Sequence, residues 1–180
     1  MEQMLILVDH SDEIVGYAPR STCHRGTGKL HRAITVFLFN SQGEVLLQRR
    51  KSRLWDGHWD IAGATHPLHY PGHDESYAEA GARCLQTEWG VRTPLEHVVG
   101  FTYYARFHRS CESEYCVLLA GHQRGIVQMN PDYAYDLCWM NCQEFQRDIA
   151  EQPSLYTPWA CIAAEKFFAH PLGHRLSASC

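Results

Sequence analysis

Residues 33–48 read AITVFLFNSQGEVLLQ, and this stretch decides the fold that the sequence predicts. The β-branched and aromatic run Ala33–Phe39 is typical of a buried strand, and Asn-Ser-Gln-Gly at 40–43 is a turn signal. Glu44–Gln48 then follows as a second apolar run. Two such runs joined by a short turn predict a β-hairpin.

The segments on either side of this hairpin predict more strands and two helices. In Glu75–Trp89, apolar residues recur at three- and four-residue spacing, and Asp74 and Gly90 are suitable cap residues at its two ends. Ser154–His170 predicts a second, amphipathic helix with Pro158 in its first turn. Further strands are expected at Met4–Asp9, Trp59–Ala64, 97–107, 113–120 and Leu137–Asn141, with loops at 10–32 and 65–74.

Strands mixed with a few helices predict an α/β sandwich around a mixed sheet, and the lack of a long linker predicts a single domain over residues 1–180. The composition is that of a globular chain, since 45% of the residues are hydrophobic and 20% are charged. A net charge of −4 and a pI near 6.3, without a basic run, disfavour nucleic-acid binding. An anionic substrate must therefore be held locally, by a few arginines or by a metal.

The N-terminal stretch MEQMLILVDHSDE contains a short apolar run without a basic flank, so it predicts neither a signal peptide nor a membrane span. We therefore expect a cytoplasmic protein without membrane insertion. The 8 cysteines form no CxxC pair, and in a reducing compartment they are expected to be thiols. The 12 histidines are many for this length and make a metal site worth seeking.

Three separated stretches are rich in residue types that bind metals. His24 and His31 flank a glycine-containing loop, and they converge only if that loop folds back between them. His66 precedes a proline, and Glu112 and Glu114 stand two apart at the head of a predicted strand, where both carboxylates face the same side. Taken separately, each stretch fits a solvated loop or an ordinary charged strand as well as a metal site.

Together with their surroundings, these stretches resemble type I isopentenyl diphosphate isomerases, which belong to the Nudix superfamily. The resemblance covers roughly residues 4–165 and depends on the order and spacing of several motifs rather than on any one of them. The matching motifs are Arg20, His24, Leu30-His31-x-Ala33, Val36-x-Leu38-Phe39-Asn40-x2-Gly43-x-Val45-Leu46-Leu47-x-Arg49-Arg50, Trp55-x-Gly57-x-Trp59, His66-Pro67, Arg83-x4-Glu88-x-Gly90-Val91, Glu112-x-Glu114-x-Cys116 and Thr157-Pro158-Trp159.

The resemblance implies two bound metal ions. The first would have roughly octahedral coordination by three histidines and two glutamates: His24, His31, His66, Glu112 and Glu114. This ligand set suits Mn²⁺, Mg²⁺ or Zn²⁺, and the ligand types alone do not choose among them. The second would be Mg²⁺, held with the help of Glu88 and bridging the diphosphate of the substrate.

The same resemblance implies how a prenyl diphosphate would be bound and isomerised. Its diphosphate would be contacted by basic side chains, namely Arg20, Arg50, one of Lys51 or Arg53, and Arg83. Glu114, with Tyr103 beside it, would protonate the C=C bond, which requires a strong acid in a dry site. Trp159 would stabilise the resulting carbocation through its ring face. From the residues alone, Trp159 is equally expected as a core aromatic, and the arginines as solvated surface side chains.

The sequence departs from the family pattern at Ala64, two positions before His66, where the family has a cysteine that serves the other side of the cation. Ala64 is still expected to line the substrate site, but alanine has no exchangeable proton. If the chain is an isomerase, the proton transfer assigned to the thiol would then be carried out by Thr65, Asp60, Tyr103 or a water molecule. Alternatively, the enzyme would protonate a longer prenyl diphosphate whose cation then cyclises. The chain could also be a hydrolase or an inactive binder, and Ala64 could be the natural residue or a deliberate substitution for cysteine.

Of these alternatives, hydrolase activity has the least support from the residues present. Nudix hydrolases use a glutamate-rich helix of the pattern Arg-Glu-x-x-Glu-Glu to gather Mg²⁺ and activate water. Only Arg83 and Glu88 remain of that pattern, and Cys84 and Thr87 stand at two of the carboxylate positions. We therefore expect an isomerase acting on a C5 prenyl diphosphate, with cyclisation of a longer one as the alternative, in a monomer or small homo-oligomer.

Overall fold

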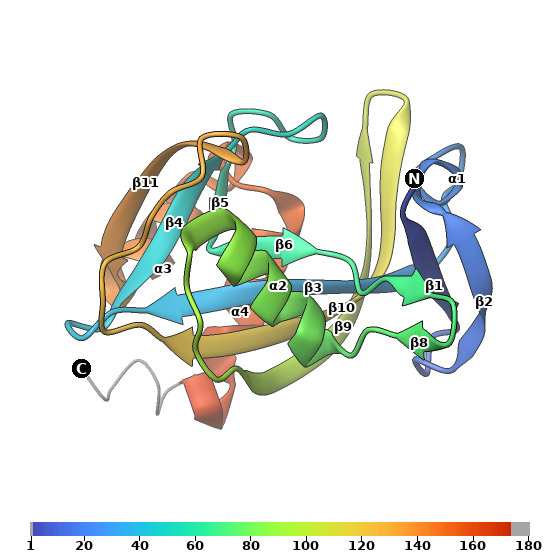
Figure 1. Ribbon diagram of the computed structural model, residues 1–180. Helices are drawn as coiled ribbons and strands as arrows, with labels where there is room; N and C mark the ends of the chain where they lie inside the picture. The colour runs from blue at the N-terminus through green and yellow to red at the C-terminus, as the bar shows by residue number, and fades with distance from the viewer. Residues whose placement is uncertain (1, 174–180) are drawn as a thin grey trace.

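The computed structural model describes residues 2–173 and contains a nine-stranded mixed sheet and a separate two-stranded ribbon (Figure 1). The strands of the sheet are β1 (Met4–Val8), β2 (Ile14–Pro19), β3 (His31–Phe39), β4 (Glu44–Arg50), β5 (Trp59–Ile61), β6 (Gly63–Thr65), β9 (Glu96–Phe107), β10 (Ser110–His122) and β11 (Ala134–Asn141). The ribbon pairs β7 (His69–Tyr70) with β8 (His73–Asp74). The helices are α1 (Arg20–Cys23), α2 (Tyr77–Trp89), α3 (Cys142–Glu151) and α4 (Pro158–Ala169).

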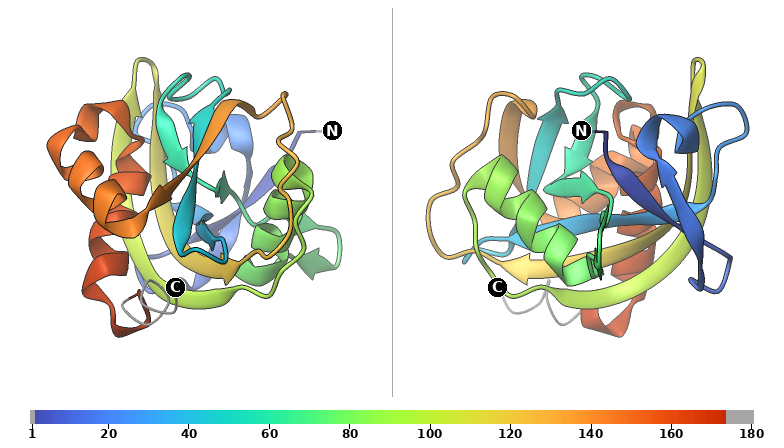
Figure 2. Two further views of the ribbon diagram at one scale, coloured as in Figure 1. Left: turned by 90° about the vertical axis from the view of Figure 1, so that its left-hand side faces the viewer. Right: turned by 45° about the vertical axis from the view of Figure 1, so that its right-hand side comes forward.

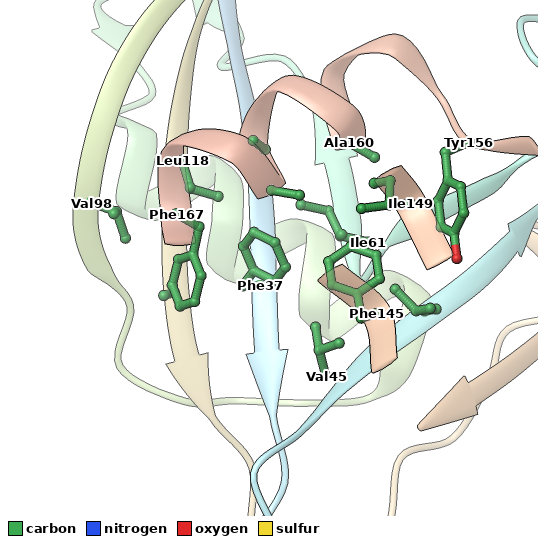
Figure 3. Close-up of a cluster of buried hydrophobic side chains, with 14 of the residues drawn as sticks. Phe37, Val45, Ile61, Val98, Leu118, Phe145, Ile149, Tyr156, Ala160 and Phe167 are labelled. Carbon is green, nitrogen blue, oxygen red and sulfur yellow. The ribbon is translucent and has the colours of Figure 1, made fainter. Parts of the chain in front are cut away.

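Helices cover both faces of the sheet, with α3 and α4 on one face and α2 on the other (Figure 2). Side chains of β3 alternate between these two layers, because successive residues of a strand point to opposite faces. Phe37 packs against Phe145 of α3 and Phe167 of α4 (Figure 3), whereas Val36 joins the cluster around Trp89 of α2. This is the α/β sandwich around a mixed sheet that the sequence predicts.

The predicted hairpin turns as expected at residues 40–43, where Gly43 donates its N–H to the carbonyl of Asn40, but its strands then separate. Phe39 with Val45 forms the described pair between β3 and β4. Beyond it, β3 pairs in parallel with β10 and antiparallel with β6, while β4 pairs with β5 and β11. A strand buried on both faces, as β3 is, commonly takes partners that are distant in sequence.

Several short elements differ from the sequence predictions. Residues 10–32, expected to be a loop, contain β2 and α1, and β2 forms because it pairs along its length with β1. The predicted strand Trp59–Ala64 is divided between β5 and β6, which pair with different strands. Residues 65–74 include the β7–β8 ribbon, and α3 was not predicted. The predicted helix Ser154–His170 begins only at Pro158, because Thr157 caps it and residues 153–155 form a separate 3₁₀ turn.

The start of α2 also differs from the prediction, which placed the cap at Asp74. Ser76 is the cap: its hydroxyl accepts the N–H of Glu79, and the Glu79 carboxylate accepts the N–H of Ser76 in return. Asp74 belongs to β8 and accepts a hydrogen bond from the hydroxyl of Tyr17. Gly90 ends the helix in the left-handed conformation, as predicted.

The cysteines within residues 2–173 form no disulfide with one another, and four of them are buried: Cys23, Cys84, Cys111 and Cys116. Cys180 lies outside the described residues. Within those same residues, no helix combines the length and the apolar character needed to cross a membrane.

Replacing Ser76 with alanine should destabilise the fold, because the substitution removes the side-chain half of the capping box on α2. We expect a loss of about 1 kcal/mol in the free energy of unfolding. In a chain of this length, that loss lowers the melting temperature by about 2–4 °C. Ser154→Ala, at an exposed site, is the matched control and should melt with the wild type. Equal melting of both variants would contradict the role of the cap.

Candidate active site

Metal-binding side chains converge where β3 begins, between β10 on one side and the end of β6 on the other. The parallel register places Glu114 of β10 directly opposite His31 of β3. Glu112 lies two residues earlier on the same face of β10. His66 follows β6, and His24 ends the short helix α1. We refer to His24, His31, His66, Glu112 and Glu114 as the ligand cluster.

The loop between His24 and His31 folds back as the sequence analysis required. Gly26 and Gly28 both have positive φ angles, of 66° and 75°, which favour glycine. Gly28 also lies so close to β10 that an added Cβ would come within 2.9 Å of the sulfur of Cys111. A larger residue would therefore push the loop, and His24 with it, away from Glu112.

The ligand cluster is compact. The three imidazole rings form a nearly equilateral triangle, with centroids 4.9, 4.9 and 5.1 Å apart. Candidate ligand atoms of His24, His31, His66 and Glu112 all lie within 4.8 Å of one another. The Oε1 atom of Glu114 is 3.0 Å from Nε2 of His66 and 3.7 Å from Nε2 of His31. A single ion could contact all five side chains.

Hydrogen bonds fix which ring nitrogen faces this centre. Nδ1 of His24 lies 3.0 Å from the carbonyl of Cys111, and Nδ1 of His31 lies 2.7 Å from the carbonyl of Lys29. A carbonyl only accepts, so each Nδ1 carries the proton and each Nε2 presents a lone pair. Both Nε2 atoms are buried without a hydrogen-bond partner, and Oε2 of Glu112 lies 2.8 Å from Nδ1 of His24. Because buried polar atoms normally have partners, these orphaned lone pairs fit a divalent metal.

The protonation states of the histidines also suit a metal. Burial lowers the pKa of His24 and of His66, and it lowers the pKa of His31 to about 3. All three imidazoles are therefore neutral near pH 7, and neutral imidazole is the form that binds metals.

The two carboxylates share one environment but titrate in opposite directions. Burial and the neighbouring Glu114 charge raise the pKa of Glu112. Burial also opposes ionisation of Glu114, but the hydrogen bond with His66 outweighs it and holds the pKa of Glu114 below the usual range. Two carboxylates this close resist ionising together, which favours keeping a proton in the pair.

Glu114 also contacts Tyr103, which lies opposite it in the antiparallel pairing of β9 with β10. The hydroxyl of Tyr103 donates to Oε2 of Glu114 over 2.5 Å. Burial raises the pKa of Tyr103 well above its ordinary value, so the phenol keeps its proton. Glu114 thus has one oxygen toward the histidines and the other toward a protonated phenol.

A cavity of about 280 Å³ opens directly onto these groups. Most of the predicted site residues line it: Arg20, Arg50, Lys51, Ala64, His66, Glu88, Tyr103, Glu112, Glu114 and Trp159. Gln48 and Cys116 also line the cavity, and neither was predicted as a site residue from the sequence. Cys116 could have been found from the two-residue period of β10, since it follows Glu114 on the same face.

The structure does not bring Arg83 or Arg53 to the cavity wall. The guanidinium of Arg83 donates instead to both carboxylate oxygens of Glu75 and to the carbonyl of His66. Glu75 in turn accepts the N–H of Leu68. The Arg83–Glu75 pair therefore supports the segment that carries His66, which is a different role from the diphosphate contact expected from the resemblance.

Glu88 lies in the same cavity but apart from the ligand cluster. Its carboxylate faces the thiol of Cys84, 3.2 Å away, and the side-chain amide of Gln48, 3.4 Å away. Burial raises the pKa of Glu88 to about 7. This carboxylate adds an oxygen donor to the cavity wall, apart from the ligand cluster.

Ala64 lies in β6 opposite Thr35 and lines the cavity. Among the described residues, the cysteine that lines the cavity is Cys116, which belongs to β10 on the side of Glu114. Cys84 packs behind β6, since a Cβ added at Gly63 would meet its sulfur at 2.9 Å. Within residues 2–173, no cysteine other than Cys116 therefore lines the cavity beside Ala64.

Comparison with known proteins agrees with this fold and site. The family model of the NUDIX domain matches residues 29–160. The isopentenyl-diphosphate Delta-isomerase 2 of Aromatoleum aromaticum is 34% identical over 167 residues, covering 90% of this chain and 86% of that protein. The isopentenyl-diphosphate Delta-isomerase of Serratia proteamaculans is 33% identical and covers 99% of this chain and 100% of that protein. The crystal structure of DR0079 from Deinococcus radiodurans has a TM-score of 0.69 at 20% identity, covering 91% of this chain and 98% of that chain, which supports the fold alone.

The α/β sandwich and the matched domain define a NUDIX protein. Within that class, the chain belongs to the isopentenyl-diphosphate Delta-isomerase family.

Removing one ligand of the cluster should weaken metal binding strongly. We expect His31→Asn to lower the affinity of the metal-free protein for Mn²⁺ or Zn²⁺ by more than about 100-fold, since the loss of outer-shell partners alone costs 10- to 100-fold. Isothermal titration calorimetry after chelator treatment measures this affinity. His97→Asn, at an exposed position, is the control and should bind like the wild type. Equal affinities for the two variants would contradict the assignment of the cluster.

Proposed function

We propose that the protein is a metal-dependent isomerase that converts isopentenyl diphosphate to dimethylallyl diphosphate. The observation that carries the proposal is Glu114, whose carboxylate contacts a buried histidine cluster through one oxygen and the Tyr103 hydroxyl through the other. The isomerases reported above, which are 33–34% identical over most of their length, support the same activity.

The reaction requires an acid strong enough to protonate an unactivated C=C bond. A divalent ion held by the ligand cluster would supply positive charge that increases the acidity of its surroundings. Glu114 and Tyr103 would carry the proton to the terminal carbon of the substrate, and positive charge would develop at the tertiary carbon. Trp159, which lines the cavity, offers the face of its ring to that charge. Loss of a proton from C2 then completes the double-bond shift.

The diphosphate would bind at the basic side of the cavity. Arg20, Arg50 and Lys51 line it and can donate charge-assisted hydrogen bonds to phosphate oxygens. Glu88 would hold a Mg²⁺ ion that bridges the diphosphate, and the ligand cluster would hold a second divalent ion, Mn²⁺, Mg²⁺ or Zn²⁺.

The size and polarity of the cavity favour a C5 substrate. Its volume of about 280 Å³ lies at the lower end of what is usual for small-molecule sites. Its lining is rich in charged and polar side chains, which suit a diphosphate and leave little apolar wall for a C10 or C15 chain. The cyclisation alternative has no support from the cavity or from the relatives reported above.

Proton removal from C2 must use a group other than a thiol on β6. Asp60 is unsuitable, because it is fully buried and does not line the cavity. Tyr103 is also unsuitable, because its protonated phenol already contacts Glu114. Thr65 lines the cavity, and water can enter it, so these are the acceptors that the site offers. A hydroxyl group or water is a weak base, and we expect slow turnover as a result.

The activity is tested by incubating the protein with Mg²⁺ and the C5, C10 and C15 prenyl diphosphates separately, with products identified by mass spectrometry. The proposal predicts dimethylallyl diphosphate from the C5 substrate and no product from the longer ones. A cyclic C10 or C15 product, or release of phosphate, would reject it.

Glu114→Gln should abolish turnover, because an amide cannot supply the proton. We expect a loss of at least about 10³-fold in kcat, within the range found for general acids. The variant should remain folded by circular dichroism, since glutamine matches glutamate in shape. Glu165→Gln, on the exposed side of α4, is the control and should keep full activity. Normal activity in Glu114→Gln would rule out Glu114 as the acid.

Ala64→Cys should increase the rate of isopentenyl diphosphate isomerisation, because a thiol on β6 would face the cation from the side opposite Glu114. A gain of about 10²-fold in kcat is expected from a restored acid–base group. Ala64→Ser, which adds a similar volume without the more acidic thiol, is the matched control and should gain much less. Equal rates in all three proteins would indicate that proton removal is not the slow step.

A further inference from the structure

A buried carboxylate lies behind the cavity wall and takes no direct part in the proposed isomerisation. Asp60 of β5 is fully buried. Its Oδ2 atom accepts from Nη1 of Arg50 at 2.8 Å, and its Oδ1 atom accepts from the hydroxyl of Thr157 at 3.0 Å. The indole N–H of Trp159 lies 2.9 and 3.0 Å from the two oxygens, and the N–H of Ile61 also donates to Oδ1.

Both oxygens of the Asp60 carboxylate therefore already accept hydrogen bonds from protein donors. Burial of an isolated carboxylate is strongly unfavourable, and here a cationic partner and several neutral donors offset that cost. Because both oxygens are occupied and Asp60 does not line the cavity, it has no free position for a substrate. Asp60 can therefore influence the site only through Arg50, Thr157 and Trp159.

Two of those partners are the side chains that the proposed function assigns to opposite ends of the substrate. Arg50 extends from β4 and Trp159 from the first turn of α4, and both line the cavity. They also contact one another, with the Arg50 guanidinium 4.9 Å from the centre of the Trp159 ring. Asp60 is hydrogen-bonded to both side chains. It therefore fixes the guanidinium of β4 and the indole of α4 relative to each other.

We propose that Asp60 is a positioning residue that aligns Arg50 with the substrate diphosphate and Trp159 with the developing carbocation. This inference rests on the proposed function. The planar guanidinium can donate to Asp60 from one nitrogen and to a phosphate oxygen from another, because its donors form a fixed fork. Negative charge at the indole N–H also makes the ring face more negative, which strengthens its attraction for a cation.

Binding of inorganic pyrophosphate with Mg²⁺, measured by isothermal titration calorimetry, tests the Arg50 part without requiring turnover. Asp60→Asn keeps the side-chain shape but removes its charge, and it should weaken pyrophosphate binding by about tenfold, as should Arg50→Gln. Asp148→Asn is the matched control, since Asp148 accepts a hydrogen bond from Tyr156 beside α4 but does not line the cavity. This control should bind like the wild type.

A double-mutant comparison separates positioning from a general effect on stability. If Asp60 acts through Arg50, the variant carrying Asp60→Asn and Arg50→Gln should bind pyrophosphate about as weakly as either single variant. Additive losses, or wild-type binding by Asp60→Asn while Arg50→Gln is weakened, would overturn the inference and leave the proposed function intact. Failure of the wild type to bind pyrophosphate would reject the proposed function itself.

Arg50→Lys provides a second test that leaves the buried carboxylate in place. A lysine ammonium keeps the positive charge but lacks the fork that serves both Asp60 and the diphosphate. We expect about tenfold weaker pyrophosphate binding, and wild-type affinity would contradict the alignment by Asp60. In assays with isopentenyl diphosphate, Asp60→Asn should raise KM and lower kcat together, because the alignment of Arg50 and Trp159 is lost. An unchanged KM would indicate a purely structural role.

Discussion

The parallel pairing of β3 with β10 is the constraint on which the rest of the structure depends. It joins segments that are about 80 residues apart and places His31 opposite Glu114. A shift of one residue in this register would turn the Glu114 side chain to the other face of the sheet. The same strand is buried on both faces, so the helices that cover it hold the register in place.

Burial of the ligand cluster determines what this site can bind. All five side chains of the ligand cluster are buried, which keeps the imidazoles neutral and leaves lone pairs without partners. The adjoining cavity is small and mostly polar, with arginines on its wall. Burial therefore favours a bound cation and an anionic ligand in the same place, which is what a metal-dependent reaction of a diphosphate requires.

The spacing of apolar residues predicts the long strands and helices of the fold. The strands β3, β9 and β10 and the helix α2 follow from apolar patterns, whereas β2 depends on pairing with β1 and could not be recognised from its own residues. The convergence of the ligand cluster likewise follows from register, so the sequence indicated it only through a family resemblance. Arg83 and Asp60 show the limit most clearly, because their hydrogen-bond partners are distant in sequence. Arg83 donates to the carbonyl of His66, and Asp60 accepts from the indole of Trp159.

The central claim is that Glu114, held against a buried metal cluster, protonates the double bond of a C5 diphosphate. The most direct measurement is incorporation of deuterium when isopentenyl diphosphate is incubated with the metal-loaded protein in D₂O. The account predicts dimethylallyl diphosphate carrying solvent deuterium in a methyl group, and no such product after removal of the metal. Rearranged product without deuterium, or unchanged substrate with the metal present, would contradict it.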